Sequence, residues 1–349
     1  MSSLEQVQLC LAMLAYAGST GEAAKGGPAL RRCVSTWLTR TPPTRELELL
    51  WGPASVRVWW QPSAPAVVAF VVGAPQAQEC FLVLRGGAPA SLWDASLESF
   101  GCLEQEPWSW AGDADGLAPA ICAGLHRKLG ALRELAPEEG CLGAGRTLTE
   151  FLRERLVDAS RDRRFSLRVT GHGAGGSLAV AAALWLRDTQ DGAWARDPAW
   201  DAERRAKVHC TAFAAPCFGN GDFISYLEDR LPEAEFIQNH LDHVPALWDP
   251  QTMLELPKLY APHVREPAMI RVLVEAISTE IERQGVEYEQ PPAHVLEGRL
   301  QTSLQPTFTA QAEYQHLHAY VELLGLSEVL DVDEIFERPS GSDDGPIAQ

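Results

Sequence analysis

The sequence has no long apolar run and too few basic residues to balance its acidic ones. A transmembrane helix needs about 18 to 20 consecutive apolar residues, and no uncharged apolar stretch of that length occurs. Lys and Arg number 29 against 47 Asp and Glu, which gives a formal net charge of −18. The lack of such a run predicts no transmembrane segment. Because the negative charge repels nucleic-acid phosphates and anionic membrane surfaces, we expect no nucleic-acid partner.

Closely spaced cysteine pairs are missing as well. The 8 cysteines are scattered along the chain without a C-x-x-C motif, which favours reduced, partly buried thiols over a disulfide scaffold or a zinc site. Disulfides in an exported form of the protein remain an open alternative. We therefore predict no metal and no cofactor.

A basic N-terminal run, which a signal peptide would have, is also missing. The first residues include Glu5, and the apolar stretch 7–17 is interrupted by Gln8 and has no clear cleavage site. We interpret this stretch as a first helix rather than a signal peptide. This predicts a cytoplasmic protein, with export by a signal-independent route as the open alternative.

The composition is that of a globular protein, with 46% hydrophobic and 22% charged residues. A chain of 349 residues with this composition commonly folds as one α/β unit around a large core. We expect a single domain over residues 1–330. Residues 331–349 are acidic and rich in Pro, Gly and Ser, which predicts a partly disordered tail.

Hydrophobic patterning predicts alternating strands and helices. The continuous apolar run 80–84 is typical of a central strand that is buried on both faces. Further strands are expected at 56–60, 65–72, 165–170, 208–213 and 235–239, and helices at 5–17, 28–39, 117–135, 147–159, near 174–186 and at 267–284. This alternation predicts an α/β fold with a mostly parallel central sheet and helices on both faces.

Two irregular segments are candidates for a lid and a cap. Residues 88–116 contain Trp93, Trp108 and Trp110 among Pro, Gly and acidic residues, which is typical of a surface loop. The segment 249–312 has little regular pattern apart from one amphipathic helix. We expect an apolar ligand site beneath these segments.

A glycine-rich turn joins the strand expected at 165–170 to the helix after it. The sequence VTGHGAGG, from Val169 to Gly176, has the form G-x-nucleophile-x-G between a strand and a helix of small residues, which is a nucleophile elbow. Small residues are needed at Gly171 and Gly175 because the strand and the helix nearly touch. The central position is Gly173, which has neither oxygen nor sulfur to offer as a nucleophile.

Five segments, in the family's chain order, resemble the class 3 (fungal-lipase-like) lipases of the α/β-hydrolase superfamily. They are Cys80 to Gly87 with its Arg-Gly pair, the VTGH and GG around Gly173, Phe213 to Asn220, Asn239 to Pro245 (NHLDHVP) and Tyr314 to Tyr320 (YQHLHAY). The resemblance implies an α/β-hydrolase fold with lid or cap insertions. It also implies a serine hydrolase that acts on acyl esters of lipids.

The resemblance implies a catalytic site that has lost its serine. Gly173 stands at the nucleophile position, Asp242 would orient the imidazole, and His316 would be the general base, with His318 as the alternative. The elbow would consist of Gly171, His172 and Gly175.

Further roles follow from the same resemblance. The backbone N–H groups of Gly87 and Ala174 would form the oxyanion hole, and Gly87 stands where family members usually have Ser or Thr. The loop with Trp93, Trp108 and Trp110 would form the lid and acyl site, in transient contact with a lipid interface.

The same residues also fit plainer interpretations. Gly171, Gly173 and Gly176 satisfy G-x-G-x-x-G, the pattern of a nucleotide-binding α/β domain, although the motif lies mid-chain without an obvious acidic residue at the end of the next strand. Asp242 alone is compatible with a turn or helix cap. A non-catalytic lipid- or protein-binding module that uses the hydrolase cleft is the other alternative.

A glycine at the elbow predicts a site that is formed but lacks its nucleophile. The nucleophile of this fold has a backbone conformation that costs about 1–3 kcal/mol for a residue with a Cβ, and glycine avoids most of that cost. Ser177 lies four residues further along the helix, about 6 Å by helical rise, and cannot replace the missing hydroxyl. A chain with glycine at this position is expected to be inactive or nearly so, and both a natural pseudoenzyme and an engineered knock-out fit the sequence.

Overall fold

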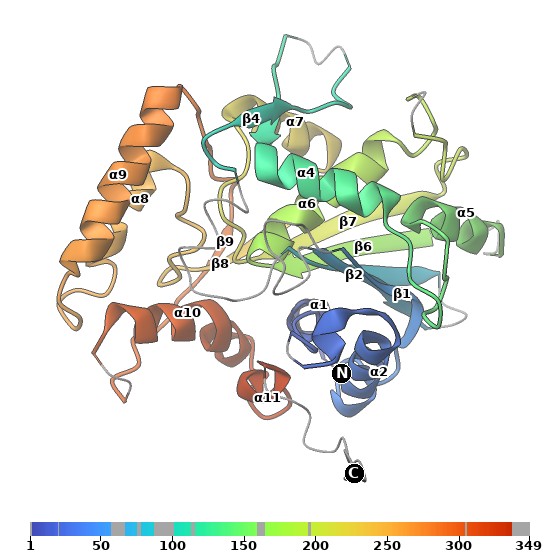
Figure 1. Ribbon diagram of the computed structural model, residues 1–349, viewed down its shortest axis with the longest axis horizontal. Helices are drawn as coiled ribbons and strands as arrows, with labels where there is room; N and C mark the ends of the chain where they lie inside the picture. Colours follow the sequence, from blue (N-terminus) through green and yellow to red (C-terminus); the bar gives the residue numbers. More distant parts are fainter. Residues whose placement is uncertain are drawn as a thin grey trace, which may run out of the picture.

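A mostly parallel sheet forms the centre of the computed structural model (Figure 1). The structure describes residues 2–19, 21–56, 67–74, 78–86, 101–112, 116–158, 165–194, 197–303 and 306–336. Within these ranges, seven strands run in the order β1-β2-β3-β6-β7-β8-β9. Their bounds are β1 Glu48–Val56, β2 Val67–Gly73, β3 Glu79–Arg85, β6 Phe165–His172, β7 Ala206–Phe213, β8 Glu235–Asn239 and β9 His294–Leu296.

The sheet changes from antiparallel to parallel pairing at β3. Strands β1, β2 and β3 pair antiparallel, whereas β3, β6, β7, β8 and β9 are parallel neighbours. Strand β6 pairs parallel with β3 on one side and with β7 on the other. The carboxyl ends of these three strands, at Arg85, His172 and Phe213, therefore lie at the same edge of the sheet. Open α/β sheets bind their ligands at this edge.

Helices cover both faces of the sheet (Figure 1). One core contains side chains of α4, α5, α6 and α7, and the other contains side chains of α1, α2, α10 and α11. The helix bounds are α1 Leu4–Leu14, η1 Ala23–Lys25, α2 Gly27–Arg40, α4 Ala123–Glu134, α5 Leu148–Asp158, α6 Ala174–Asp188, α7 Gly221–Arg230, α8 Pro250–Met253, η2 Leu256–Lys258, α9 Ala268–Gln284, α10 Phe308–Leu323 and α11 Val332–Phe336.

Strand β2 shows why both faces have to be covered. All of its side chains are buried, and they alternate between the two cores. Val67 and Val71 pack on the side of α4 and α6, whereas Val68 and Phe70 pack on the side of α1 and α2. The predicted α/β architecture, with helices on both faces of a mostly parallel sheet, is therefore confirmed.

The tryptophans expected in a lid are core residues where the structure describes them. Trp108 and Trp110 are 3% and 5% exposed. Their indole N–H groups donate to the buried carboxylates of Asp188 and Asp197, at 2.9 Å each. The assignment of these two residues to a lid or acyl site is wrong, because both indoles are anchored in the core. Trp93 lies outside the described residues.

Several boundaries differ from the sequence-based expectation. The strand expected at 56–60 is β1, which already ends at Val56, and residues 57–66 lie outside the described part. The helix expected at 117–135 begins only at Ala123, because β5 Ala120–Cys122 pairs with β4 Gln105–Pro107.

Two more segments have regular structure that the sequence did not indicate. The segment 249–312 is more than a cap, since it contributes β9 as the edge strand of the sheet beside β8. The expected tail begins with α11, which packs into the core next to α1. In the part of the chain that the structure describes, no helix combines the length and apolarity needed to cross a bilayer.

Candidate active site

The turn between β6 and α6 has the geometry of a nucleophile elbow. Strand β6 ends at His172, α6 begins at Ala174, and Gly173 alone joins them. Gly173 has φ 58° and ψ −128°, a conformation that strains any residue with a Cβ. Its N–H donates to the carbonyl oxygen of Phe213 on β7 at 2.9 Å, which fixes the turn against the neighbouring strand.

The flanking glycines let strand and helix approach each other closely. A Cβ on Gly171 would lie 2.2 Å from the carbonyl oxygen of Gly175. A Cβ on Gly175 would lie 2.5 Å from the carbonyl oxygen of Leu84 on β3. Both positions therefore require glycine, because the backbone atoms opposite them cannot move aside.

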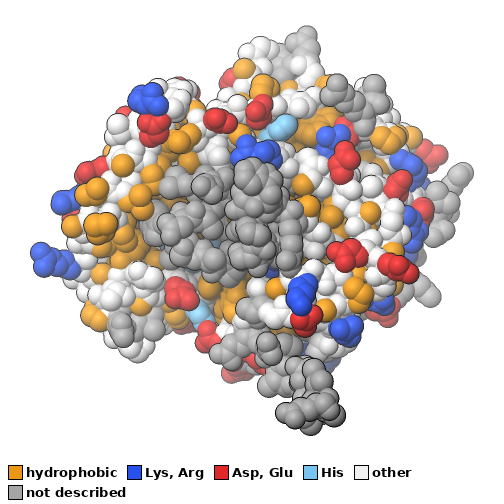
Figure 2. Space-filling view, viewed as in Figure 1, with side chains coloured by type: hydrophobic (Ala, Val, Ile, Leu, Met, Phe, Trp, Pro, Cys, Tyr) orange, Lys and Arg blue, Asp and Glu red, His pale blue; other side chains and the backbone are white. Residues whose placement is uncertain are grey.

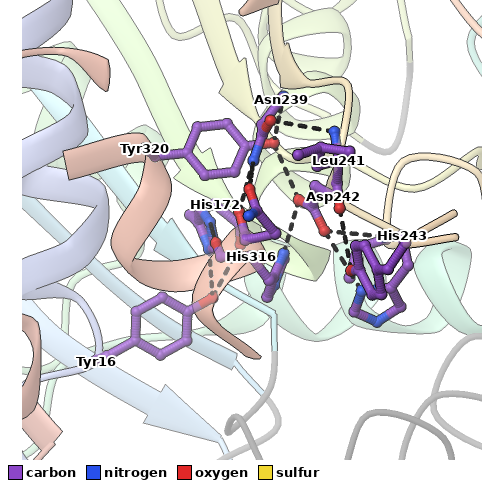
Figure 3. A network of polar contacts seen from close by, with 11 residues as sticks. Tyr16, His172, Asn239, Leu241, Asp242, His243, His316 and Tyr320 are labelled. Carbon is purple, nitrogen blue, oxygen red and sulfur yellow. Dashed lines mark hydrogen bonds and ion pairs between the residues drawn. The ribbon is translucent and has the colours of Figure 1, made fainter. Parts of the chain in front are cut away.

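The imidazole of His316 faces Gly173. A Cβ built on Gly173 would lie 3.2 Å from Nε2 and 3.3 Å from Cε1 of this ring, which α10 supplies. On the opposite side of the ring, Nδ1–H donates to Oδ2 of Asp242 at 2.9 Å (Figure 3). Asp242 follows β8, and its side chain is fully buried. Gly173, His316 and Asp242, which the sequence predicted from distant parts of the chain, thus lie next to one another in this order.

The carboxylate of Asp242 accepts hydrogen bonds from several directions. Besides His316, the hydroxyl of Tyr320 donates to Oδ2 and the N–H of Val244 donates to Oδ1, at 3.0 Å each. Burial raises the pKa of Asp242, but the charge and hydrogen bond of His316, with smaller contributions from His243 and Val244, leave that pKa below its ordinary value. Asp242 is therefore ionised at neutral pH, as a group that orients an imidazolium must be.

His172, which the sequence indicated only as an elbow residue, also holds His316 in place. Its Nε2–H donates to the backbone carbonyl oxygen of His316 at 2.8 Å, and the two ring centroids are 4.5 Å apart. Burial and then the neighbouring His316 lower the pKa of His172 to about 3. His172 consequently stays neutral at physiological pH and keeps the tautomer that donates to His316.

Tyr16 is a site residue that the sequence analysis missed. It follows α1 and is 6% exposed. Its hydroxyl donates to the carbonyl oxygen of His172 at 3.1 Å and lies 3.3 Å from Nδ1 of the same residue (Figure 3). The same hydroxyl would lie 3.6 Å from a Cβ on Gly173. No motif marks Tyr16, and the only signal in the sequence is that the first helix ends near it.

Arg85, at the end of β3, secures the segment that contains Tyr16. It is 1% exposed, and its guanidinium donates to the carbonyl oxygen of Ala15 at 3.2 Å and to the hydroxyl of Ser19 at 2.9 Å. Burial lowers the pKa of Arg85 to about 10, so the group remains charged at neutral pH. The end of β3, the elbow and residues 15–19 are thereby tied together.

The two histidines proposed as alternatives for the base have different surroundings. His318 stacks on Tyr314, with ring centroids 5.6 Å apart, and its Nε2 lies 3.5 Å from Asp333. Side chains two positions apart on a helix point in different directions, so α10 directs only His316 toward the elbow. The alternative assignment of His318 is therefore wrong.

Of the two backbone N–H groups expected in the oxyanion hole, only that of Ala174 lies in the described part of the chain. Ala174 is the first residue of α6, and a helix leaves the N–H groups of its first turn without an internal partner. That N–H lies beside Gly173 and has no partner within α6. Gly87 lies outside the described residues, so its role remains a prediction.

Neither a metal cluster nor a disulfide accompanies the site in the described ranges. No group of three His, Cys, Asp or Glu side chains there is arranged to hold a metal ion. All eight cysteines are buried and unpaired. The chemistry that the described residues offer is that of an imidazole supported by a carboxylate.

Known proteins match both the fold and the elbow region. The structure of M37 lipase matches with a TM-score of 0.86 and 27% identity, and the match covers 96% of each chain. Lipase II from Rhizopus niveus matches with a TM-score of 0.45 and 14% identity over 72% of this chain and 78% of its own. A family model described as "Lipase (class 3)" matches residues 131–251. Comparison with curated protein sequences gives no match.

The fold and the elbow define an α/β-hydrolase. Within that class, the match to M37 lipase over nearly the whole chain and the match of the family model agree with each other. Together they support a hydrolase of the class 3 lipase family, in agreement with the resemblance seen in the sequence. The residues matched by the family model include the elbow and Asp242 but neither Tyr16 nor His316.

Proposed function

We propose that this chain has the active site of an acyl-ester hydrolase in which Gly173 replaces the nucleophile, so that no acyl-enzyme forms. The observation that best supports this proposal is the 3.2 Å between Nε2 of His316 and the Cβ position of residue 173. A serine hydroxyl is one bond beyond Cβ, which brings it within hydrogen-bond reach of that nitrogen. The base is present, and the attacking oxygen is missing.

The roles of the remaining residues follow from this arrangement. In a serine form, His316 would accept the hydroxyl proton during attack on the ester carbonyl and return it to the leaving alcohol. Asp242 would stabilise the imidazolium, and Ala174 N–H would bind the oxyanion together with Gly87. Without the nucleophile, the oxyanion hole and substrate binding leave a residual acceleration of about 10³–10⁴-fold over water in serine proteases, which is very slow turnover.

Replacing Gly173 by serine is expected to restore ester hydrolysis. Gly173→Ser should raise kcat/KM on a short chromogenic ester by at least about 10³-fold over the Gly173 chain, because the triad is then complete. The Cβ needs the imidazole to move by a few tenths of an ångström, which leaves its bond to Asp242 within reach. Steady-state kinetics of both purified proteins measure the effect.

Two control variants separate the hydroxyl from the added carbon. Gly173→Ala supplies the Cβ without the hydroxyl, and Gly173→Ser combined with His316→Ala removes the base. Both should be as inactive as the Gly173 chain. A folded Gly173→Ser protein that hydrolyses no ester would contradict the proposed function.

Non-catalytic binding through the same site is the second candidate function. Gly173 itself favours it, because glycine adopts φ 58° without strain and keeps the elbow intact while no nucleophile is present. In that case the chain binds an acyl lipid or a protein, and Gly173→Ser gains no activity. Calorimetry with an ether analogue of the lipid ester, which cannot be hydrolysed, measures the binding.

The lipid substrate is proposed to lie at an interface contacted by α9. Met269 and Val272, on the first turns of this helix, are 81% and 58% exposed, and Leu254 beyond α8 is 44% exposed. Hydrophobic side chains gather on this side of the molecule, at the left of Figure 2 where α9 lies in Figure 1. Such exposed apolar residues are typical of surfaces that contact lipids or proteins.

A further inference from the structure

Lys128 is a charged residue on the buried side of helix α4. The other long side chains on this side are apolar, with Leu125, Leu129 and Leu132 at helical spacing, and all three are buried. Lys128 lies among them and is only 5% exposed. Lysine is almost never buried to this extent unless its ammonium has a polar partner. A charge in an apolar stripe contradicts the local pattern, which is typical of a residue that has a task other than packing.

One partner of Lys128 lies at the end of β3. Its Nζ donates to the carbonyl oxygen of Gly86 at 2.7 Å, a short distance that is typical of a hydrogen bond from a charged group. Burial lowers the pKa of Lys128 to about 8; of the groups that face it, the thiol of Cys122 raises this pKa and Arg127 lowers it. Lys128 is therefore mostly charged at neutral pH.

Gly86 lies directly against the first turn of α6. A Cβ on Gly86 would be 2.4 Å from the carbonyl oxygen of Ala174 and 2.9 Å from the nitrogen of Gly175. The Gly86 backbone therefore lies beside the N-terminus of α6, whose N–H groups carry a partial positive charge. The peptide group of the Gly86 carbonyl also includes the N–H of Gly87, the second expected oxyanion donor, which itself lies outside the described residues. Lys128 thus binds the backbone next to both expected donors.

We propose that Lys128 is a positioning residue of the oxyanion hole, in which its ammonium holds the Gly86 carbonyl and thereby orients and polarises the neighbouring N–H donors. This inference rests on the proposed function, because an oxyanion forms only when an ester is attacked at this site. A hydrogen bond to the Gly86 oxygen draws electron density from the peptide group, which makes the N–H of the same group a stronger donor. The planar peptide also transmits the orientation.

The arrangement costs stability and favours an anion. A buried ammonium close to the positive end of α6 is unfavourable as long as no negative charge is present. During ester hydrolysis the carbonyl oxygen of the substrate becomes an oxyanion, and the ammonium and the helix N-terminus then both stabilise it. This effect is larger in the transition state than in the bound ester. Lys128 should therefore affect kcat more than KM.

The test replaces Lys128 in the full-length Gly173→Ser protein. Methionine has nearly the length of lysine and suits the apolar side of α4, so Lys128→Met should fold. We expect kcat on a short chromogenic ester to fall by about 10- to 100-fold, because the donors are displaced and weakened but not removed. KM should change by less than about twofold. Steady-state kinetics of both purified proteins measure the two constants.

The pH dependence gives a second measurement, which does not require a change of Lys128. In Gly173→Ser, kcat should decline above about pH 8, because the ammonium then loses its proton and becomes a weaker donor. Lys128→Met should lack this decline. Burial raises the pKa of Cys122 to about 12, so its thiol does not titrate in this range. Leu129→Ala is the control: it opens a cavity on the same side of α4 and should lower the urea midpoint, but keep the decline of kcat.

Three outcomes would overturn this inference: an unchanged kcat in folded Lys128→Met, a kcat of Gly173→Ser that does not decline above pH 8, or loss of that decline in Leu129→Ala as well. In each case an active Gly173→Ser protein leaves the proposed function standing. If Gly173→Ser is folded and silent, the proposed function fails, and this inference fails with it.

Discussion

Gly173 combines a backbone conformation that suits glycine with a location where a hydroxyl would be useful. Its φ of 58° lies in the region where a side chain is strained. Such strain is common at functional positions, where the surrounding structure has to hold it in place. Stability therefore favours glycine at position 173, whereas ester hydrolysis would need a residue with a hydroxyl there.

A residue with a Cβ at position 173 is expected to destabilise the fold. Gly173→Ser and Gly173→Ala should each lower the free energy of unfolding by about 1–3 kcal/mol, because both introduce the strained conformation and a tight contact with His316. Urea denaturation measures this change. Gly285→Ala is a matched control, since its φ of 68° is also positive but no atom lies within 4 Å of its Cβ position.

Comparison of positions 173 and 285 separates the backbone strain from the contact with His316, the two causes of the expected loss in the free energy of unfolding. Gly285→Ala should lose only the backbone part, about 1–2 kcal/mol for a left-handed residue. If the serine and alanine variants at position 173 were as stable as the original chain, the elbow would not be strained.

The sequence predicted the residues of the site that belong to motifs. Gly171 and Gly175 could be predicted because strand and helix meet at the elbow, and any Cβ there would strike backbone. Asp242 and His316 could be predicted from the resemblance. Tyr16 could not, because its place depends on how α1 packs against the sheet, and that packing leaves no local pattern.

At the scale of secondary-structure elements, long periodic segments were predictable and short ones were not. Strands β6 and β7 lie in the middle of the sheet, α6 packs against the sheet, and all three follow clear apolar patterns. The strands β5 and β9 have three residues each, too few to show a period of two. The choice between His316 and His318 also required a helix, α10, whose orientation the sequence did not reveal.

Helix α9 is expected to matter for substrates at an interface and not for dissolved ones. In the Gly173→Ser background, Met269→Ser combined with Val272→Ser should lower the rate on an emulsified long-chain triacylglycerol by about three- to tenfold, because apolar contact area is lost. The rate on a soluble short ester should not change. Titration of the rate against the amount of emulsion measures the effect.

A control variant for α9 lies at the other end of the same helix. Glu282→Gln changes an exposed side chain of the last turn and should leave both rates as they are. Equal losses on both substrates after the double substitution would indicate damage to the fold. Unchanged rates on both would contradict the contact of α9 with lipid.

At the scale of the whole molecule, buried neutral imidazoles set the response to acid. Burial, as the largest cause, lowers the pKa of His172 to about 3 and that of His243 to about 4, against an ordinary value of 6.5. Below pH 6.5 the unfolded chain takes up protons that these residues cannot take up in the fold. The stability they provide is therefore complete above pH 6.5 and decreases as the pH falls toward their folded pKa values.

Acid is accordingly expected to destabilise the protein well before its carboxylates titrate. Each of the two imidazoles should reduce the free energy of unfolding by about 2 kcal/mol between pH 7.5 and pH 5. Urea denaturation at a series of pH values measures the slope. His172→Asn removes one titrating group and should make the dependence shallower, although it also weakens the fold. A slope that is unchanged by this substitution would contradict the folded-state pKa of His172.

The assembly of the site involves nearly the whole described chain. Tyr16 comes from the N-terminal segment and His316 from α10, while the elbow and Asp242 lie between them. The arrangement as one domain and the cytoplasmic location were inferred from the sequence and stay predictions.

The three glycine positions of the elbow differ in whether they can tolerate a side chain. A Cβ on Gly171 or Gly175 would collide with backbone oxygens that cannot move aside. A Cβ on Gly173 would instead contact the side chain of His316, which can move. A substitution of Gly171 or Gly175 would disrupt the turn between β6 and α6, and a second, compensating substitution would be needed to restore it. At the central position, a single substitution would supply the hydroxyl that the proposed function requires, and the residues around it would need to move by only a few tenths of an ångström.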